Sequence, residues 1–449
     1  MRAPMANSSI YSKITSLAWR NVIRNWRHSR AALITITCGF VANALLQGFI
    51  AHATKAAVDN FSLRGMFADV LVVREGAALD QPSKLWKSAM GRPEQEFIDK
   101  FLLSDPDVEH RARFLTVTGL ASAGNRSAIY FGVGYDIVEG EKIRTERYKR
   151  DVIVGDILSP DRPGLVTGIG LGASLGCEGG YKDRSKARMD TPETLVNNLL
   201  PLKCAENQVS LTATTEHSSI NQIDLPIVGL TDAGLRDIDD RVVFMSLPAA
   251  QKLMDTDKVS FFTVKLRPGA SQSAFRERFS AAASAAGFKL QAPSWRNYGQ
   301  GAELATELDL LTLLNAIFGS IMATMCVMAI TSTMIKIVTE RTREVGSLRS
   351  MGFLRKHIVY MFCAEGGFIS LIACIIGLGI TAALSRGIAL ANLGYTAGLS
   401  QTAFPVRVME TPLLWAVSIL MLTGLTVITS SLTARRAANQ VIADAMRHA

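Results

Sequence analysis

Four long stretches of this 449-residue sequence almost lack charged residues. Each runs for 24 to 29 residues, and together they hold a single Asp, Glu, Lys or Arg, which is Glu365. A bilayer core takes about 20 apolar residues as a helix, whereas a water-soluble helix of that length carries a charged face. The sequence therefore predicts four transmembrane helices, at residues 31–54, 310–335, 358–385 and 411–434.

Acidic residues are also absent from residues 1–30, which carry six Lys and Arg. Together with residues 336–357 and 435–449 this segment has a net charge of +12, and the rest of the chain has −3. Because Lys and Arg accumulate on the cytoplasmic side of a membrane, both termini and residues 336–357 are predicted to be cytoplasmic. The large segment 55–309 and the loop 386–410 then lie on the opposite face. This topology accounts for the excess of Lys and Arg over Asp and Glu, so we expect no nucleic-acid partner.

The N-terminal segment, residues 1–30, shows a helical pattern before the first span. Its apolar residues recur at helical spacing, and Lys and Arg occupy the other face, which predicts an amphipathic helix in the headgroup layer. The apolar positions are Ile14, Leu17, Ala18, Val22 and Trp26. A basic flank that only satisfies the charge rule explains the Arg residues equally well. The first span is longer than a signal peptide's apolar core, so we expect an uncleaved anchor.

Residues 55–309 alternate strand-like and helix-like patterns, which predicts an α+β domain, with residues from about 140 to 240 as a candidate second subdomain. Predicted strands are 68–73, 114–121, 128–135, 208–214, 224–230, 241–245 and 259–266, and predicted helices are 93–103, 248–254 and 271–286. From Ser294 the chain runs without a helix breaker into the second span. A helix that continues out of the bilayer would transmit motion of that span to the domain.

Only two of the six cysteines lie outside the predicted membrane helices. Cys177 and Cys204 share the large domain, which is in an oxidising compartment if the topology is right. They flank a polar segment that looks like an insertion, and we predict a disulfide between them. The other four cysteines are interpreted as small hydrophobic residues.

Several catalytic signatures are missing from the chain. It has no G-x-x-x-x-G-K-[ST] loop, no H-E-x-x-H and no C-x-x-C, and its six histidines have no neighbours at ligand spacing. We therefore expect no ATP hydrolysis by this chain itself, no metal site and no bound cofactor.

The loop between the second and third spans is the most informative segment. It reads TERTREVGSLRSMGFLRKH from Thr339, and Val345, Leu348 and Met351/Gly352 fall on one helical face between charged residues. A short amphipathic helix of this kind suits a groove in a cytosolic partner. The alternative is a charged loop that only obeys the charge rule, although such a loop needs no apolar face.

The stretch ERTREVGSLRSMGFLRKHIVYMFCAEGGFISLIACIIGLGI closely resembles the signature of FtsX-like permeases, the four-helix subunits of MacB-type (type VII) ABC transporters. The opening LAWRNVIRNWRHSRAALIT and the closing SLTARRAANQVIADAMR resemble the two ends of the same family, although a usual Pro is missing near the C-terminus. Between them, GIGLGASLG, DLPIVGL, DDRVVFMSLPAAQKLM and SWRNYG resemble the periplasmic domain of the lipoprotein-releasing LolC/LolE permeases. The segment from Cys177 to Cys204 and the absence of a fused ATPase depart from the pattern.

This resemblance implies a multi-pass protein of the bacterial inner membrane and a mechanotransmission mechanism. A separate cytosolic ATPase dimer binds ATP and Mg, pushes residues 340–352, and moves the periplasmic domain through the first two helices. Implied partners are that ATPase, a second permease subunit as homodimer or heterodimer, the bilayer, and a periplasmic adaptor, carrier or outer-membrane component. The residues implied in ATPase coupling are Glu340, Arg341, Glu344, Val345, Gly346, Leu348, Arg349, Met351 and Gly352.

Glu365 is the one acidic residue inside the predicted spans, about 13 Å along the helix from Lys356. Such a residue is a functional candidate by default, here as a gate or coupling contact. The alternative is a structural carboxylate paired with Arg24 or Lys336. After it, Gly366, Ser370, Ala373 and Gly377 form a small-residue ridge for close helix packing.

The resemblance favours a lipoprotein or other lipid-anchored substrate, taken from the outer leaflet or the periplasm. Efflux of drugs, peptides or siderophores is the near alternative. A different class is a non-transporting regulator of cell-wall hydrolases, which would bind a hydrolase and move nothing. A proton-coupled carrier is disfavoured because Glu365 is the lone membrane acid.

Overall fold

A computed structural model gives the fold, and it divides into two compact units. The helical unit comprises Met1–Ala53, Leu310–Leu393 and Val406–Ala449, and the α/β unit comprises Thr54–Asp309 and Gly394–Pro405. Within them the structure describes residues 5–24, 26–78, 81–144, 152–182, 199–233, 236–395 and 404–438. The predicted tail 435–449 lies outside the described residues from position 439 onward.

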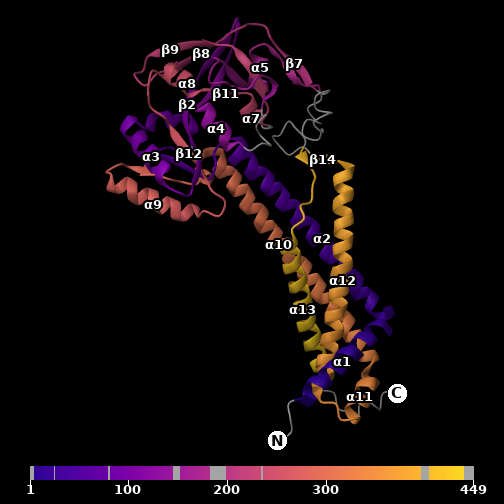
Figure 1. The fold of residues 1–449 in the computed structure, drawn as a ribbon. Coiled ribbons are helices and arrows are strands. Elements are labelled where there is room, and N and C mark those ends of the chain that lie inside the picture. Colours follow the sequence, from indigo (N-terminus) through magenta and orange to yellow (C-terminus); the bar gives the residue numbers. More distant parts are fainter. Residues whose placement is uncertain are drawn as a thin grey trace. The chain divides into compact units, whose positions relative to one another are not determined.

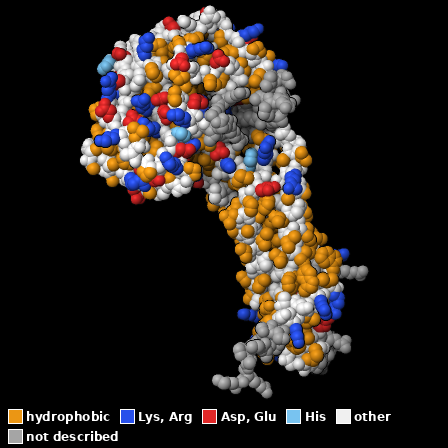
Figure 2. Space-filling view, viewed as in Figure 1, with side chains coloured by type: hydrophobic (Ala, Val, Ile, Leu, Met, Phe, Trp, Pro, Cys, Tyr) orange, Lys and Arg blue, Asp and Glu red, His pale blue; other side chains and the backbone are white. Residues whose placement is uncertain are grey.

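Six helices account for the helical unit (Figure 1): α1 Met5–Arg24, α2 Trp26–Asp59, α10 Gly299–Glu340, α11 Thr342–Ser350, α12 Arg355–Ala391 and α13 Pro412–Ala438. Four segments are long and apolar enough to cross a membrane, at Ser29–Arg64, Gly301–Ile337, Arg355–Ala391 and Pro412–Arg435. Hydrophobic side chains cover the visible surface of these helices (Figure 2). The predicted fold class, four membrane helices and a mixed α/β domain inserted after the first, is confirmed.

The first three spanning helices extend beyond the charge-free stretches. Thus α2 continues to Asp59 and a π-helical turn at Asn60–Arg64, and α10 already begins at Gly299. Charges end an apolar run, yet they do not end a helix, because a charged side chain leaves the backbone N–H(i)→O=C(i−4) bonds in place. Asn392, with a left-handed φ of 44°, caps α12.

Helix α1 packs along α12 rather than presenting its whole apolar stripe to lipid. Ile14, Ala18 and Val22 are buried in the core of the helical unit, while Leu17 and Trp26 of the predicted stripe are exposed. Tyr11 meets Tyr360 edge to face with 5.0 Å between ring centroids, and Trp19 meets Phe368 in the same way. The predicted amphipathic helix therefore forms, but its buried stripe faces protein.

The α/β unit is built on an eleven-stranded sheet in the order β13-β1-β12-β2-β3-β11-β5-β10-β4, to which β8 and β9 are added beside β2. The strands are β1 Val70–Arg74, β2 Val108–Ala123, β3 Arg126–Tyr135, β4 Val152–Gly155, β5 Leu165–Gly168, β8 Val209–Thr214, β9 Ile220–Leu225, β10 Ile227–Thr231, β11 Val242–Ser246, β12 Phe261–Leu266 and β13 Leu290–Gln291. Separate hairpin-like pairs are β6 Cys177–Tyr181 with β7 Leu199–Cys204, and β14 Gly394–Tyr395 with β15 Phe404–Pro405.

The 16-residue strand β2 organises this sheet. It pairs with β3 along most of its length, with β12 through residues 108–114, and with β8 through residues 119–122. Its buried side chains Leu115 and Val117 belong to the main apolar core of the unit. Gly124 lies in the turn between β2 and β3 and has a φ of 58°.

Helices cover this sheet through apolar contacts. The helices α3 Arg92–Ser104 and α9 Gln272–Ala285 meet through Phe97, Phe101, Phe275 and Phe279. Helix α8, Leu247–Met254, lies close on β3: a Cβ on Gly134 would fall 2.2 Å from the Ala250 Cβ, so a side chain there is excluded. Short helices are α4 Ile137–Ile143, α5 Ile169–Ser174 and α7 Arg236–Asp239, with 3-10 turns at Pro82–Ser88 and Trp295–Asn297.

Candidate functional site

The predicted coupling loop folds as the separate helix α11. Helix α10 ends at Glu340, and Arg341 leaves helical geometry with φ −107° and ψ 15° before α11 starts at Thr342. After Ser350 the chain turns at Gly352, whose φ of 92° favours glycine. The segment is thus a short helix between two breaks in helical geometry, at Arg341 and Gly352, and it lies at one end of the helical unit (Figure 1).

The two faces of α11 differ in what they contact. Val345 and Gly346 are buried, and Leu348 packs against the core of the helical unit. Glu344 is half exposed, and Met351 follows the helix with 68% of its surface exposed. The four positions predicted to form one apolar docking face are therefore divided, because Val345 and Leu348 bind this chain's own core. Met351, Gly352 and Leu354 are exposed beyond the end of α11.

Two further residues of the predicted coupling set flank this surface. Glu340 is the last residue of α10 and lies 4.0 Å from Lys336 one turn earlier. Arg349 is half-buried in the last turn of α11. A cation in the last turn of a helix interacts favourably with the helix dipole.

Glu365 is buried in α12 and binds the start of this loop. Arg341 Nη1 donates to both carboxylate oxygens of Glu365, at 3.0 and 3.1 Å, and Arg341 Nε donates to Glu344 Oε2 at 2.8 Å. The Arg341 guanidinium also lies 5.9 Å from the centroid of the Phe362 ring. One guanidinium therefore joins a carboxylate on α11 to a carboxylate on α12.

Helix α1 contributes two more groups to this cluster. Asn21 Nδ2 donates to Glu365 Oε1 at 2.6 Å, and Arg24 Nη2 lies 3.5 Å from Glu344 Oε1. The expected pairing of Glu365 with Arg24 or Lys336 is corrected, since Arg24 binds Glu344 and Lys336 binds Glu340. The sequence did not predict the contact between Asn21 and Glu365, because nothing in it distinguishes a buried amide side chain in a basic helix from one that is exposed to water.

Arg341 remains charged in this setting. Burial alone would lower the pKa of its guanidinium, but the adjacent carboxylates of Glu365 and Glu344 raise that pKa above its ordinary value. The cluster of Glu365, Arg341, Glu344 and Arg24 is electrically neutral overall, with two negative and two positive groups.

The four residues of the small-residue ridge are all buried in α12. A Cβ on Gly366 would lie 2.3 Å from Ser430 Oγ of α13, and one on Gly377 would lie 2.8 Å from the Phe40 ring of α2. Between them, Ser370 bonds to Thr423, and the Ala373 carbonyl accepts from Thr37. The ridge therefore packs α12 against α13 at one end and α2 at the other, within this chain.

In the α/β unit, Cys177 and Cys204 form a disulfide that joins β6 to β7. The two cysteines are directly opposite in the strand register, with 3.9 Å between their Cα atoms. The predicted insertion between them includes residues 183–198, which lie outside the described residues.

Residues 172–176, GASLG, fit the G-x-S-x-G pattern of serine hydrolases. That pattern requires the serine on a sharp strand-to-helix turn, yet Ser174 is the last residue of α5 and donates to the Gly170 carbonyl at 3.1 Å. Among the described residues, no group of three or more His, Cys, Asp or Glu side chains could hold a metal ion.

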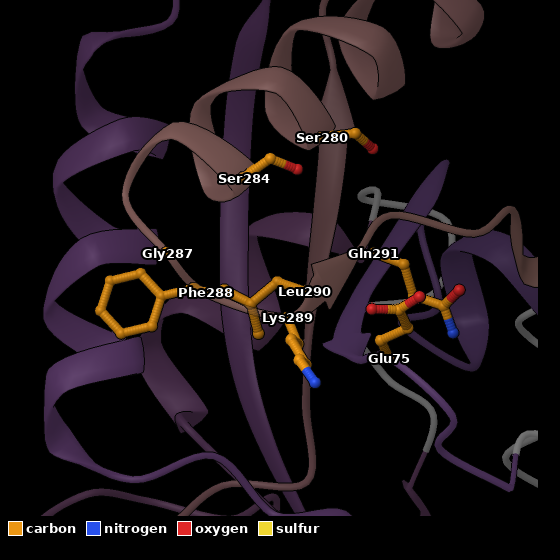
Figure 3. A pocket seen from close by; sticks show the side chains of 8 residues that line it. All are labelled: Glu75, Ser280, Ser284, Gly287, Phe288, Lys289, Leu290 and Gln291. Atoms are coloured by element: carbon orange, nitrogen blue, oxygen red, sulfur yellow. The ribbon is translucent and has the colours of Figure 1, made fainter.

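A hollow of about 430 Å³ lies where the end of α9 meets β13 and the end of β1 (Figure 3). Ser280 and Ser284 line it from the helix, while Glu75 and Gln291 lie beside each other on the opposite side. Phe288 points away from them, toward the Phe97 ring at 5.1 Å. The lining is polar, so this hollow does not suit an acyl chain.

A family model described as "FtsX-like permease C-terminal" matches residues 316–442 of the chain. This match confirms the predicted resemblance to FtsX-like permeases, and the particular closeness to the lipoprotein-releasing permeases stays a prediction. The matched region contains α11, α12 and most of α10, hence Arg341, Glu344 and Glu365.

Two solved structures are similar to the chain. The extracellular domain of the noncanonic ABC-type transporter YknZ from Gram-positive bacteria matches with 9% identity and a TM-score of 0.33, over 50% of this chain and 99% of its own. The periplasmic region of MacB from Actinobacillus actinomycetemcomitans matches with 10% identity and a TM-score of 0.31, over 53% of this chain and 92% of its own. No curated protein matches the chain.

Proposed function

We propose that the chain, which matches the FtsX-like permease C-terminal family model over residues 316–442, is the membrane subunit of an ATP-driven ABC transporter. A separate cytosolic ATPase dimer, which holds ATP and Mg, drives it by pushing residues 340–352. The observation that carries this proposal is the arrangement of α11, which binds its own core through Val345 and Leu348 and leaves Met351 and Leu354 exposed.

The test is a purification of the tagged protein from its native membrane in detergent, under ATP-trapping conditions, followed by mass spectrometry. We expect an ATPase with a P-loop, with or without a second permease chain. Met351→Asp and Leu354→Asp should each reduce the copurified ATPase about tenfold or more, since a charge in a desolvated contact is costly. Leu103→Asp, at an equally exposed leucine in the α/β unit, is the matched control.

An ATPase that copurifies equally with all three variants would remove the docking assignment. Wild-type protein that retains no ATPase under trapping conditions would contradict the transporter mechanism itself. A cell-wall hydrolase found beside the ATPase would favour the regulatory alternative.

We further propose a lipid-anchored substrate that does not cross the bilayer through this protein. Two polar contacts inside the helical unit join one spanning helix to another: Thr37 donates to the Ala373 carbonyl at 3.1 Å, and Asn43 Nδ2 lies 3.5 Å from Ser418 Oγ. Proteoliposomes holding the whole complex and a lipidated protein should release that protein on ATP addition. ATP-dependent loss of a soluble dye instead would support efflux.

The proposed location is the bacterial inner membrane, with both termini and α11 in the cytoplasm and the α/β unit in the periplasm. The charge distribution of the connecting segments supports this orientation. Membrane-impermeant thiol labelling of intact cells, with Met351→Cys and Leu103→Cys compared, tests it. Only the cysteine at position 103 should react.

A further inference from the structure

Five polar side chains form a closed ring that joins three helices at one end of the helical unit. Asn21 and Arg24 of α1 bind Glu365 and Glu344, and Arg341 binds both carboxylates. Asn21 and Arg24 are three residues apart on one face of α1, so the path returns to its starting helix. We call these five residues the polar ring.

The polar ring has a buried half and an open half. Asn21 and Glu365 are 5% and 4% exposed, and the Arg341 side chain is 11% exposed. In contrast, the side chains of Arg24 and Glu344 are 68% and 50% exposed. The buried half therefore supplies strong charge-assisted hydrogen bonds, while water screens the open half.

Arg341 is the residue through which the ring acts on α11. It lies at the break between α10 and α11, and it contacts Glu344 of α11 and Glu365 of α12 at the same time. Val345 and Leu348 of α11 also contact the core of the helical unit, through apolar side chains. Apolar contacts tolerate sliding and rotation, whereas a guanidinium fixed to two carboxylates sets one orientation.

We propose that Arg341 is a positioning residue that fixes α11 against α12 and α1, and that α1 is thereby part of the element that moves when α11 is pushed. The second half of this statement rests on the proposed function. A buried ion pair is poor evidence for stability alone, because two apolar residues would serve equally well. The directional hydrogen bonds of the Arg341–Glu365 pair give α11 a defined orientation.

The experiment is a double-variant cycle on the full-length protein in detergent, read by amide hydrogen exchange over residues 342–350. Arg341→Gln leaves the buried Glu365 carboxylate without a cation, and Glu365→Gln leaves Arg341 with Glu344 as its carboxylate partner; each should speed this exchange about tenfold. The double variant Arg341→Gln/Glu365→Gln removes both charges and keeps amides that can bond to each other. It should return exchange most of the way to the wild-type rate.

Lys336→Gln is the matched control, because it removes a positive charge from an exposed pair one turn before the break. It should leave exchange over 342–350 unchanged. Should Arg341→Gln fail to reach the membrane, Arg24→Gln and Glu344→Gln open the exposed half of the ring, and the same cycle is run with that pair. There we expect roughly a twofold effect, as suits a screened pair.

A second readout separates positioning from general destabilisation. In the complex with its copurified ATPase, Arg341→Gln should lower kcat for ATP hydrolysis at unchanged KM for ATP, and the double variant should restore kcat. A loss of folded protein would change the amount of complex and leave kcat alone. If the wild type retains no ATPase, the proposed function is wrong. The hydrogen-exchange experiment still tests the role of the polar ring in that case.

Two results would overturn the proposal. One is wild-type exchange over α11 in both single variants. The other is a double variant whose exchange is as fast as the faster single variant, which would mean that the two charges act independently.

Discussion

Arg341 and Glu365 are 24 residues apart in the sequence, yet one nitrogen of the guanidinium contacts both oxygens of the carboxylate, at 3.0 and 3.1 Å. The pair ties the start of the loop segment to the third turn of α12. Glu365 is consequently a structural partner of the coupling segment rather than an isolated acid in a membrane helix. The predictions below test the surroundings of this pair and the packing of both units.

Asn21→Leu should lower the free energy of unfolding by about 2 kcal/mol, because Glu365 then loses a short hydrogen bond to a buried charge. Thermal denaturation in detergent measures this. Thr15→Val, which removes an exposed contact of 3.1 Å to the Tyr360 hydroxyl, should cost less than about 0.5 kcal/mol. Equal losses in the two variants would show that Asn21 does not support the carboxylate.

Tyr130→Phe should stabilise the α/β unit by about 1 kcal/mol, because the Tyr130 hydroxyl is buried without a partner among the described residues. Burial also raises the pKa of Tyr130, so the unfolded chain loses a proton near pH 10 that the folded chain keeps. The wild type therefore loses stability as the pH rises above about 10, and the phenylalanine variant loses less.

Denaturant unfolding at pH 8 and at pH 11 checks both points. Tyr135→Phe is the control, since the Tyr135 hydroxyl donates to Glu141 at 3.2 Å and its removal should cost about 1 kcal/mol. A destabilised Tyr130→Phe would reveal a partner for that hydroxyl.

Gly366→Ala should destabilise the helical unit by roughly 1–3 kcal/mol, because its Cβ would lie 2.3 Å from Ser430 Oγ. Ser430→Ala in the same chain removes the clashing atom, which has no hydrogen-bond partner in the described part of the chain, and should recover much of the loss. Gly379→Ala adds a methyl group to open space and should be neutral. Thermal melting of the wild type, of Gly366→Ala, of Gly366→Ala/Ser430→Ala and of Gly379→Ala measures these differences in stability.

The Cys177–Cys204 disulfide predicts how many cysteine thiols react before and after reduction. Denatured but unreduced protein should label at four cysteines, Cys38, Cys326, Cys363 and Cys374, and reduced protein should label at six. Replacing Cys177 and Cys204 by serine should cost the α/β unit about 3 kcal/mol, since the bond closes a loop with a sequence separation of 27. Six reactive thiols before reduction would contradict the pairing.

The sequence identified all four spanning helices because lipid cannot solvate a charge, and the resulting gap in charge is long and sharp. It identified β1, β3, β8, β11 and β12, where apolar and polar residues clearly alternate or a short apolar run is present. It missed β4 and β5, which are four residues each and too short to show a period. The single strand expected at residues 224–230 is two, since Pro226 interrupts the ladder between β9 and β10.

The sequence singled out Arg341, Glu344 and Glu365 as candidates but did not predict their contacts. Local spacing indicates that Val345 and Leu348 share a face, yet only the three-dimensional packing shows that this face is already buried. Likewise, the sequence offers Arg24 and Lys336 as cations for Glu365, and the fold brings Arg341 and Asn21 to that carboxylate instead. Long-range pairings of this kind depend on how α1, α11 and α12 meet, which no local pattern encodes.

The strand β2 has a consequence for how this sequence can change over evolutionary time. Because β2 pairs with β12 through one half and with β8 through the other, its length sets two strand registers at once. A single inserted or deleted residue between Phe114 and Gly119 would leave one register intact and turn the side chains of the other to the wrong face. Substitutions along β2 can therefore accumulate, whereas changes in its length cannot.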